Sequence, residues 1–143
     1  MSLCGEFRHS LDAKNRLFIP AKHREVLGDT VMVVRNLERK CLIVYSMEEW
    51  DKYVDSVLSK IPVSRRQDIN RFLFRRSLKT GYDTQGRIML TPELLAHAEM
   101  ERGTAVIVGC GYYAEIWNEK NFEEIIAEEN AEELNALLRQ YDV

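Results

Sequence analysis

The sequence predicts an α+β fold that is rich in β-structure and built from two similar halves. A five-residue motif, Asp12-Ala13-Lys14-Asn15-Arg16, returns as Asp83-Thr84-Gln85-Gly86-Arg87. The copies are 71 positions apart at the motif and 72 positions apart at Tyr45 and Trp117, so we expect a length change of one residue to cover the whole unit. A repeat of about 45 residues indicates pseudo-symmetry, because half-units too small to enclose a core can bury their apolar faces against each other.

Each copy is predicted to open with a β-hairpin. Phe7, His9 and Leu11 alternate with polar residues, and residues 17–19 form the expected returning strand. Asn15 and Gly86 occupy the same place in the two motifs, and both residue types readily accept a positive φ. A left-handed turn position is therefore expected in both hairpins.

A short helix is predicted after each hairpin. Pro20 and Pro92 fall where a helix can begin, and Thr91 is a candidate N-cap. Gly28 and Gly103 are the candidate ends of these helices.

Two strands and an amphipathic helix complete the first copy. The strands are expected at residues 31–35 and 41–45. Ser46, followed three residues later by Glu49, is a capping-box pattern, and apolar residues then recur at helical spacing until Pro62.

The C-terminal helix is predicted to open at Asn118. Its outer face is acidic, which favours packing across the molecule or contact with another subunit. Its apolar stripe consists of Phe122, Ile125, Ile126, Leu134, Leu137 and Leu138.

Charge is distributed unevenly along the chain. The net charge is −3, but residues 1–80 hold 16 Lys and Arg against 10 Asp and Glu, whereas residues 81–143 hold 4 against 13. A polyanion-binding surface therefore belongs mostly to the first half. The basic segment at residues 64–79 fits nucleic-acid contact, but its basic and apolar faces are not cleanly divided. We favour a structural or intersubunit helix whose arginines pair with the acidic half.

Composition argues against several classes of protein. With 143 residues and 45% hydrophobic content the chain suits one domain-sized body, without a secretory signal or an apolar run long enough for a membrane span. The cysteines are scattered, which indicates reduced thiols rather than disulfides. No cysteine or histidine pair has the spacing of metal ligands, so no metal site is predicted. These residues are Cys4, Cys41, Cys110, His9, His23 and His97. An enzyme is not expected, since the chain has no Gly-rich phosphate loop and no Gly-x-Ser-x-Gly turn.

The repeated motif has a chemical reason at each fixed position. Asp12 begins a tight turn, where its carboxylate can accept hydrogen bonds from backbone N–H groups further along. Arg16 closes the turn, within reach of the same carboxylate, and an oriented guanidinium presents a planar fork that matches O6 and N7 of guanine. Lys14 has the reach and charge for a phosphate. The spacing supports equally a hairpin whose Asp–Arg pair only fixes the turn.

The wider pattern resembles the MraZ family of bacterial proteins over nearly the whole chain. The resemblance rests on Gly5-Glu6-Phe7, Asp12-Ala13-Lys14-Asn15-Arg16-Leu17-Phe18-Ile19-Pro20-Ala21, Tyr45 with Glu49-Trp50, Asp83-Thr84-Gln85-Gly86-Arg87-Ile88, and Glu115-Ile116-Trp117. It implies two tandem AbrB-like swapped-hairpin units that form a pseudo-two-fold β-barrel with flanking helices. The expected parts are a first DNA-binding unit at residues 5–47, linking helices at 48–76, a second unit at 77–120 and a C-terminal helix at 121–143.

The resemblance also implies a function. Members of the family are transcriptional regulators, usually repressors, of the bacterial division and cell-wall gene cluster. Ring-like homo-oligomers of more than two subunits bind short G-containing direct repeats of double-stranded DNA upstream of their own gene. The expected location is the cytoplasm, in association with the nucleoid, and no cofactor, membrane partner or small-molecule substrate is implied.

Carried over to this chain, the resemblance assigns two groups of residues. The expected DNA-binding residues are Lys14, Asn15, Arg16, Arg87 and Arg8, and the motif-orienting residues are Asp12, Asp83 and Gly86. The family usually has Gly at the fourth position of both motifs, so Asn15 adds polar atoms beside the DNA-facing tip and can shift base preference. The first copy is expected to matter more, because Gln85 replaces the lysine of the first motif.

Two other functions fit parts of the sequence. An AbrB-like antitoxin or protein-interaction module could act through the acidic C-terminal helix, although such antitoxins usually carry a single short hairpin unit and a disordered tail. RNA binding suits a basic surface, but the chain lacks the aromatic-rich strand signature of the common single-strand RNA modules.

Overall fold

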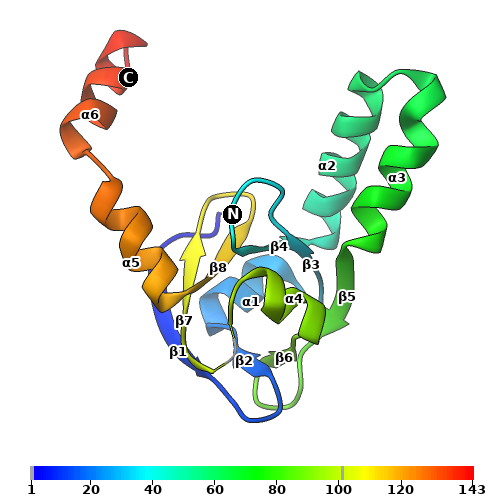
Figure 1. Ribbon diagram of the computed structural model, residues 1–143, viewed down its shortest axis with the longest axis vertical. Coiled ribbons are helices and arrows are strands. Elements are labelled where there is room, and N and C mark those ends of the chain that lie inside the picture. The colour runs from blue at the N-terminus through cyan, green and yellow to red at the C-terminus, as the bar shows by residue number, and fades with distance from the viewer. Residues whose placement is uncertain (1, 101) are drawn as a thin grey trace.

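The two halves of the chain interlock in one α+β body, from which helices project as two arms (Figure 1). The computed structural model describes residues 2–100 and 102–143. One sheet has six strands in the order β1-β7-β8-β4-β3-β5, and the other pairs β2 with β6. The strands are β1 (Glu6–Leu11), β2 (Arg16–Phe18), β3 (Thr30–Arg35), β4 (Leu42–Ser46), β5 (Ser77–Gly81), β6 (Arg87–Met89), β7 (Gly103–Gly109) and β8 (Ala114–Asn118). The helices are α1 (Ala21–Leu27), α2 (Met47–Lys60), the 3-10 helix η1 (Val63–Arg65), α3 (Arg66–Arg75), α4 (Pro92–His97), α5 (Glu119–Glu128) and α6 (Ala131–Gln140).

The strands are exchanged between the halves. β1 pairs antiparallel with β7 of the second half, and β5 pairs antiparallel with β3 of the first half. Tight turns join β1 to β2 and β5 to β6, but the ladder of β2 is formed with β6. The predicted α+β class and the pseudo-two-fold arrangement of swapped hairpins are therefore confirmed.

The pseudo-two-fold axis can be located from the strand register. In the central pair of the large sheet, Ile43 of β4 lies opposite Glu115 of β8. In the small sheet, Leu17 of β2 lies opposite Ile88 of β6. Both pairs join equivalent positions of the repeat, so the axis passes through them.

The expected closed barrel is not formed. β1 and β5 remain the edges of the six-stranded sheet, because the two strands that follow them, β2 and β6, pair with each other as a separate ribbon. Leu17 and Ile88 of that ribbon are fully buried and belong to the main core, together with residues of α1, α4 and the large sheet. The ribbon and the sheet thus enclose one core without a continuous hydrogen-bonded cylinder.

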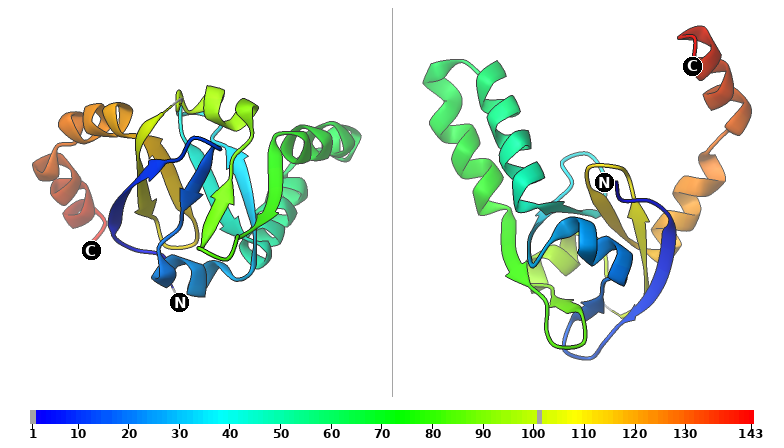
Figure 2. Two further views of the ribbon diagram at one scale, coloured as in Figure 1. Left: turned by 90° about the horizontal axis from the view of Figure 1, so that it is seen from below. Right: turned by 180° about the vertical axis from the view of Figure 1, so that it is seen from behind.

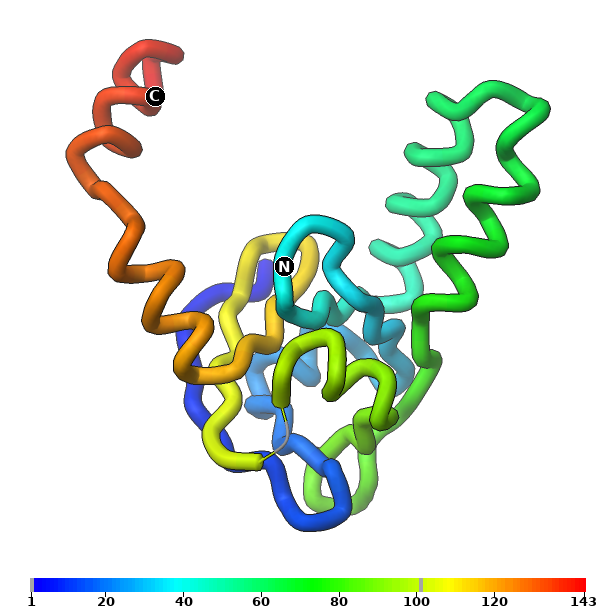
Figure 3. The backbone as a smooth tube through the Cα atoms, in the orientation of Figure 1, coloured from blue at the N-terminus to red at the C-terminus, as the bar shows by residue number. Residues whose placement is uncertain are grey.

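Each arm is attached to the body by its own aromatic cluster. Trp50 of α2 and Leu73 of α3 pack with Tyr45 of β4 at the root of the α2–α3 hairpin. Trp117 of β8 and Phe122 of α5 pack together at the root of the other arm. Figure 3 shows the two arms diverging on the same side of the body.

The helix caps agree with the sequence patterns. The Ser46 hydroxyl accepts a hydrogen bond from the Glu49 N–H at 3.1 Å, and Thr91 caps α4 through the Leu94 N–H at 3.3 Å. Asn118 caps α5 by accepting hydrogen bonds from two backbone N–H groups. No helix within the described residues is long and apolar enough to cross a membrane.

Two expectations about the helices were wrong. Gly103 does not end a helix: α4 stops at His97, the positive φ of 55° is taken by Glu99, and Gly103 begins β7. The C-terminal segment forms two helices, because α5 ends at Glu128 and Asn130 caps a new helix by accepting the Glu133 N–H at 3.1 Å.

The expectation that a length change of one residue covers the whole unit was also wrong. Thr30 lies opposite Gly81, and Thr104 lies opposite Ser10. The copies are therefore 71 positions apart at Ser10 and Gly81 but 74 apart at Thr30 and Thr104. The second copy has three extra residues before β7. Its β7–β8 turn is shorter than the β3–β4 turn of the first copy, so the offset has returned to 72 positions at Trp117.

Candidate nucleic-acid interface

The two repeated turns lie side by side at the end of the body opposite the arms (Figures 1 and 2). One turn joins β1 to β2 and the other joins β5 to β6, and the β2–β6 ribbon holds them together. The fold therefore brings Asp12, Arg16, Asp83 and Arg87, which come from both halves, into one surface.

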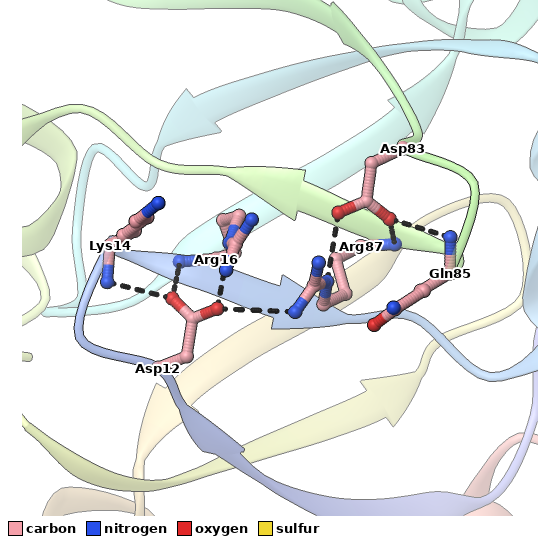
Figure 4. Close-up of polar contacts among 6 residues, drawn as sticks. All are labelled: Asp12, Lys14, Arg16, Asp83, Gln85 and Arg87. Carbon is pink, nitrogen blue, oxygen red and sulfur yellow. Dashed lines mark hydrogen bonds and ion pairs between the residues drawn. The ribbon is translucent and has the colours of Figure 1, made fainter.

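Asp12 organises the first turn through both carboxylate oxygens (Figure 4). Its Oδ1 accepts hydrogen bonds from the backbone N–H groups of Lys14 at 2.9 Å and Arg16 at 2.8 Å. Its Oδ2 accepts a hydrogen bond from Arg16 Nε at 2.7 Å. The carboxylate thus fixes the backbone of the turn and the direction of the arginine at once.

Asp83 repeats this arrangement in the second turn. Its Oδ1 accepts the backbone N–H groups of Gln85 at 2.9 Å and Arg87 at 3.0 Å, and its Oδ2 accepts Arg87 Nε at 2.8 Å. The local geometry of the two motifs is therefore nearly the same, although their middle residues differ.

The two turns are joined to each other by reciprocal contacts. The Leu90 N–H donates to the Asn15 carbonyl at 2.8 Å, and the Ile19 N–H donates to the Gly86 carbonyl at 3.0 Å. Arg87 Nη1 also lies 3.4 Å from Asp12 Oδ2. This ion pair is one-sided, since the described contacts include no matching pair between Arg16 and Asp83.

The fourth motif position has the expected left-handed conformation in both turns. Asn15 has a φ of 61° and Gly86 a φ of 78°. A Cβ atom at Gly86 would lie 2.7 Å from Cζ of Arg24, so the second turn has both a conformational and a steric reason for glycine. Asn15 meets the conformational requirement because its short polar side chain tolerates the left-handed region.

The carboxylates of both motifs are held in the ionised form. The pKa of Asp12 lies below its ordinary value chiefly because the Arg16 backbone N–H donates to it, with the Arg16 side chain adding to the effect. The pKa of Asp83 is lowered in the same way by Arg87. Each arginine remains accessible, with 27% of the Arg16 side chain and 23% of the Arg87 side chain exposed.

This geometry leaves the Nη edge of the Arg16 guanidinium without a partner, whereas Arg87 Nη1 already contacts Asp12 Oδ2. Asp12 engages the Nε side of Arg16, and within residues 2–100 and 102–143 no hydrogen bond occupies its two Nη atoms. Two parallel N–H donors in one plane are suited to a bidentate acceptor pair on a base edge or phosphate. Lys14 lies exposed at the tip beside this fork.

The sequence of this repeated unit can be compared with known families. The family described as "MraZ protein, putative antitoxin-like" matches residues 3–70 and matches again over residues 73–140. The chain belongs to the MraZ family. The two matched segments cover nearly all of the chain and give MraZ its tandem organisation.

Curated MraZ proteins are similar to this chain over most of their length. One named "Transcriptional regulator MraZ" from Pediococcus pentosaceus is 40% identical over 126 residues, which span 87% of this chain and 86% of that protein. Relatives with the same name from Oenococcus oeni and Ligilactobacillus salivarius are 37% and 36% identical. Both alignments span 97% of this chain and 98% of the relative.

Arg8, which the resemblance to MraZ assigned to DNA, is not brought to the paired turns. It lies on β1 and pairs with Glu6 at 2.6 Å, Glu123 at 2.8 Å and Glu119 at 3.3 Å. Two of these carboxylates belong to α5, so Arg8 ties the edge strand to the C-terminal arm. Its contact with DNA stays a prediction.

Arg24 lies beside the paired turns, and the sequence analysis did not single it out. Its Nε donates to the Ile19 carbonyl at 2.9 Å, and its guanidinium lies over the rings of Phe18 and Tyr82. It also contacts the second turn at Gly86. Comparison of the two copies gave no sign of Arg24, because the equivalent residue 71 positions later is the apolar Leu95.

The basic segment of this MraZ chain is helical but does not pair with the acidic half. Arg65 of η1 and Arg71 of α3 both form ion pairs with Asp68 of α3, at 3.2 and 2.9 Å. Among the described residues, no ion pair joins α3 to residues 81–143. The expected pairing is therefore not made within one subunit, because α3 and the acidic arm project from opposite edges of the body (Figure 1). Pairing between subunits stays a prediction.

Proposed function

We propose that the chain is a transcriptional regulator that binds double-stranded DNA through its paired turns. The relatives are named transcriptional regulators, which supports the coarse function, and the geometry of Asp12–Arg16 and Asp83–Arg87 supports the mode of binding. The single observation that carries the proposal is that two aspartate-oriented arginines from distant parts of the chain share one exposed surface.

In this proposal each part of the paired turns has a role. Arg16 and Arg87 contact base edges, with guanine O6 and N7 as the matching acceptor pair. Lys14 contacts a phosphate, and Asn15 lies beside the base-reading edge of the first turn. Asp12, Asp83 and Gly86 hold the turns in shape, which reduces the conformational entropy lost on binding.

The proposed target follows from the family resemblance. We propose short G-containing direct repeats upstream of the chain's own gene, in the bacterial division and cell-wall gene cluster, with binding that represses transcription. The proposal includes action in the cytoplasm at the nucleoid.

We further propose that the working form is a ring-like homo-oligomer of more than two subunits, formed head to tail. The hairpin arm carries exposed Arg66, Arg71 and Arg75, whereas the other arm carries exposed glutamates on α5 and α6. Leu134, Leu137 and Leu138 of α6 are each about half exposed. A basic helix, α3, on one arm and acidic helices, α5 and α6, on the other fit a heterologous contact, in which one arm meets the other arm of the next copy.

A gel shift with the DNA upstream of the chain's own gene tests the function. We expect a discrete complex whose affinity falls steeply as salt rises, because lysine and arginine contacts release counterions from the phosphates. Scrambled DNA of the same length is the control. Affinity unchanged between low and moderate salt, or equal affinity for scrambled DNA, would overturn specific binding through these turns.

A second candidate is an antitoxin-like module that binds another protein through the C-terminal arm. The exposed leucines of α6 and the antitoxin-like wording of the family description favour it. Deletion of α6 separates the candidates, since it would abolish binding of a protein partner while leaving the paired turns intact.

A further inference from the structure

A cavity of about 210 Å³ lies where the hairpin arm joins the sheet, far from the paired turns. Its walls come from the end of β3, the β3–β4 loop, β4 and the roots of α2 and α3. Tyr45, Trp50 and Tyr53 form an aromatic wall, in which the Tyr45 and Tyr53 rings stack with centroids 5.5 Å apart. The size and lining suit a small organic molecule with an apolar body.

Three residues that line this cavity carry N–H donors without acceptors. Arg35 Nε, Trp50 Nε1 and Arg76 Nε are buried and have no hydrogen-bond partner within residues 2–100 and 102–143. Folded proteins pair nearly all of their buried polar groups, so three unpaired donors around one cavity need an explanation. Trp50 is 1% exposed, and its indole N–H is itself closed to solvent.

The cavity also concentrates positive charge. Arg35 and Arg76 both line it, and among the described ion pairs neither has a carboxylate partner. The pKa of Arg76 is lowered first by burial and then by the nearby charges of Arg35 and Arg75. Glu38 lies at the rim, but its side chain is exposed and forms no ion pair with either arginine in the described contacts. A pair of unneutralised guanidiniums beside an aromatic wall attracts an anion with an apolar body.

We propose that this cavity binds a small organic anion that combines an aromatic or apolar body with one carboxylate or phosphate group. The body packs against Tyr45, Trp50 and Tyr53, and the anionic group accepts hydrogen bonds from the guanidinium groups of Arg35 and Arg76. The occupied site links the β3–β4 loop to the hairpin arm, so the ligand acts on the arm's attachment to the body. This site is separate from the paired turns and does not depend on their proposed function.

Titration calorimetry of the full chain tests the proposal with phenylacetate as the probe. Phenylacetamide has nearly the same shape without the charge, and inorganic phosphate has the charge without the apolar body. We expect phenylacetate to bind about ten-fold or more tightly than either control compound. Equal binding of phenylacetate and phenylacetamide, or no heat from phenylacetate at millimolar concentration, would overturn the proposal.

Variants locate the binding within the chain. Arg76→Gln and Arg35→Gln should each reduce phenylacetate affinity about ten-fold or more, whereas Arg39→Gln should leave it nearly unchanged. Arg39 is exposed in the β3–β4 loop and does not line the cavity, so it controls for the loss of one positive charge. Circular dichroism identifies any variant that fails to fold. If one cavity variant fails to fold, the phenylacetate affinity of the other cavity variant decides the test.

The competing occupant is an acidic side chain from another copy of the chain. Light scattering of the same variants distinguishes it. If Arg35→Gln and Arg76→Gln change the oligomer mass while the wild type binds no phenylacetate, the cavity serves the subunit interface and the small-anion proposal is wrong. If the variants keep the wild-type oligomer mass but lose phenylacetate binding, the small-anion proposal is supported.

Discussion

Arg16 and Lys14 are two positions apart in one turn, but the structure gives them different surroundings. Asp12 holds Arg16 through its Nε, so the guanidinium is fixed before any ligand arrives. Lys14 has only its backbone N–H fixed, and its side chain extends freely from the tip. A fixed planar fork suits a base edge, whereas a mobile ammonium suits a phosphate.

The first prediction separates these two roles. Arg16→Ala should weaken binding by about 1–3 kcal/mol per engaged subunit and reduce the preference for a G·C pair, because a bidentate base contact is lost. Lys14→Ala should weaken all DNA sequences alike and reduce the salt dependence. Fluorescence anisotropy with matched and mismatched DNA measures both effects. Equal losses on both DNAs for both variants would show that Arg16 does not contact a base.

The second prediction concerns pH and the Asp12 carboxylate. Its pKa is lower in the folded chain than its ordinary value of 3.8, mainly because the Arg16 backbone N–H donates to it. The unfolded chain therefore binds this proton more tightly. The ionised carboxylate therefore contributes its full stabilisation of the fold at pH values above its ordinary pKa. This contribution is lost as the pH falls through the lower pKa that Asp12 has in the folded chain.

Asp12→Asn should accordingly lower the urea midpoint at neutral pH, and the difference from the wild type should narrow below about pH 4. Asp55→Asn, on the exposed face of α2, is the matched control for removing one charge. Urea titrations at several pH values supply the measurement. A difference that stays constant down to pH 2 contradicts the assignment.

At the scale of elements, the turn between β5 and β6 shows two requirements for Gly86. Its φ of 78° disfavours any side chain, and an added Cβ would meet the Arg24 guanidinium at 2.7 Å. Gly86→Ala should therefore cost about 1–3 kcal/mol of folding stability. A double-mutant cycle with Arg24→Ala divides this cost between backbone strain and collision.

If the collision matters, Gly86→Ala should be less costly in the Arg24→Ala background than in the wild type. Asn15→Gly is the matched control in the other turn and should leave stability nearly unchanged, since Asn15 already has a φ of 61°. Equal costs in both backgrounds would mean that only the positive φ matters.

Local elements were predictable because their signals lie within a few residues. The Ser46 and Thr91 caps, the left-handed positions at Asn15 and Gly86, and the end of α2 before Pro62 all follow from side-chain chemistry next to the backbone that it affects. The motif's internal geometry also followed, because the Asp12 carboxylate reaches backbone N–H groups only two and four residues away.

Long-range features were not predictable from the residues alone. Alternation in residues 6–11 predicts a strand, but it does not say that the partner is β7, and the resemblance supplied that exchange. The apolar stripe gave only a weak sign of the break between α5 and α6, namely the gap between Ile126 and Leu134 in which Asn130 caps the new helix. The one-sided Arg87–Asp12 pair and the contact of Arg24 with Gly86 depend on how the halves meet.

At the scale of the whole molecule, recognition and proposed assembly occupy opposite ends. The paired turns lie at one end of the body, and the arms leave from the other (Figure 3). A head-to-tail contact through the arms would therefore leave the turns free, and several copies could present them to one DNA duplex with a gain in avidity.

The fourth prediction tests this assembly. Multi-angle light scattering at micromolar concentration should give a mass of more than two subunits. Leu137→Glu should lower it, because the exposed stripe of α6 would lose apolar contact and gain charge. Met89→Glu is the control, as Met89 is similarly exposed but lies on β6 at the other end. A wild-type monomer, or equal effects of both variants, would argue against contact through this arm.

The fifth prediction concerns the spacing of DNA repeats. Successive subunits should meet repeats about one helical turn apart, ~10 bp, so that every pair of turns faces the same groove. Inserting half a turn between repeats should weaken binding strongly, while inserting a full turn should weaken it less. Operators that tolerate the half-turn insertion would exclude this geometry even if the oligomer exists.

The exchange of strands between halves has a consequence for the order of folding during synthesis. Glu6 of β1 pairs with Val108 of β7, so the first strand made by the ribosome lacks its partner until most of the chain has emerged. β3 likewise waits for β5, and the β2–β6 ribbon cannot close before residue 89 is made. Contacts of such long sequence separation slow folding, and an unpaired strand edge favours aggregation. The nascent first half should therefore stay open to proteases and chaperones until translation is nearly complete.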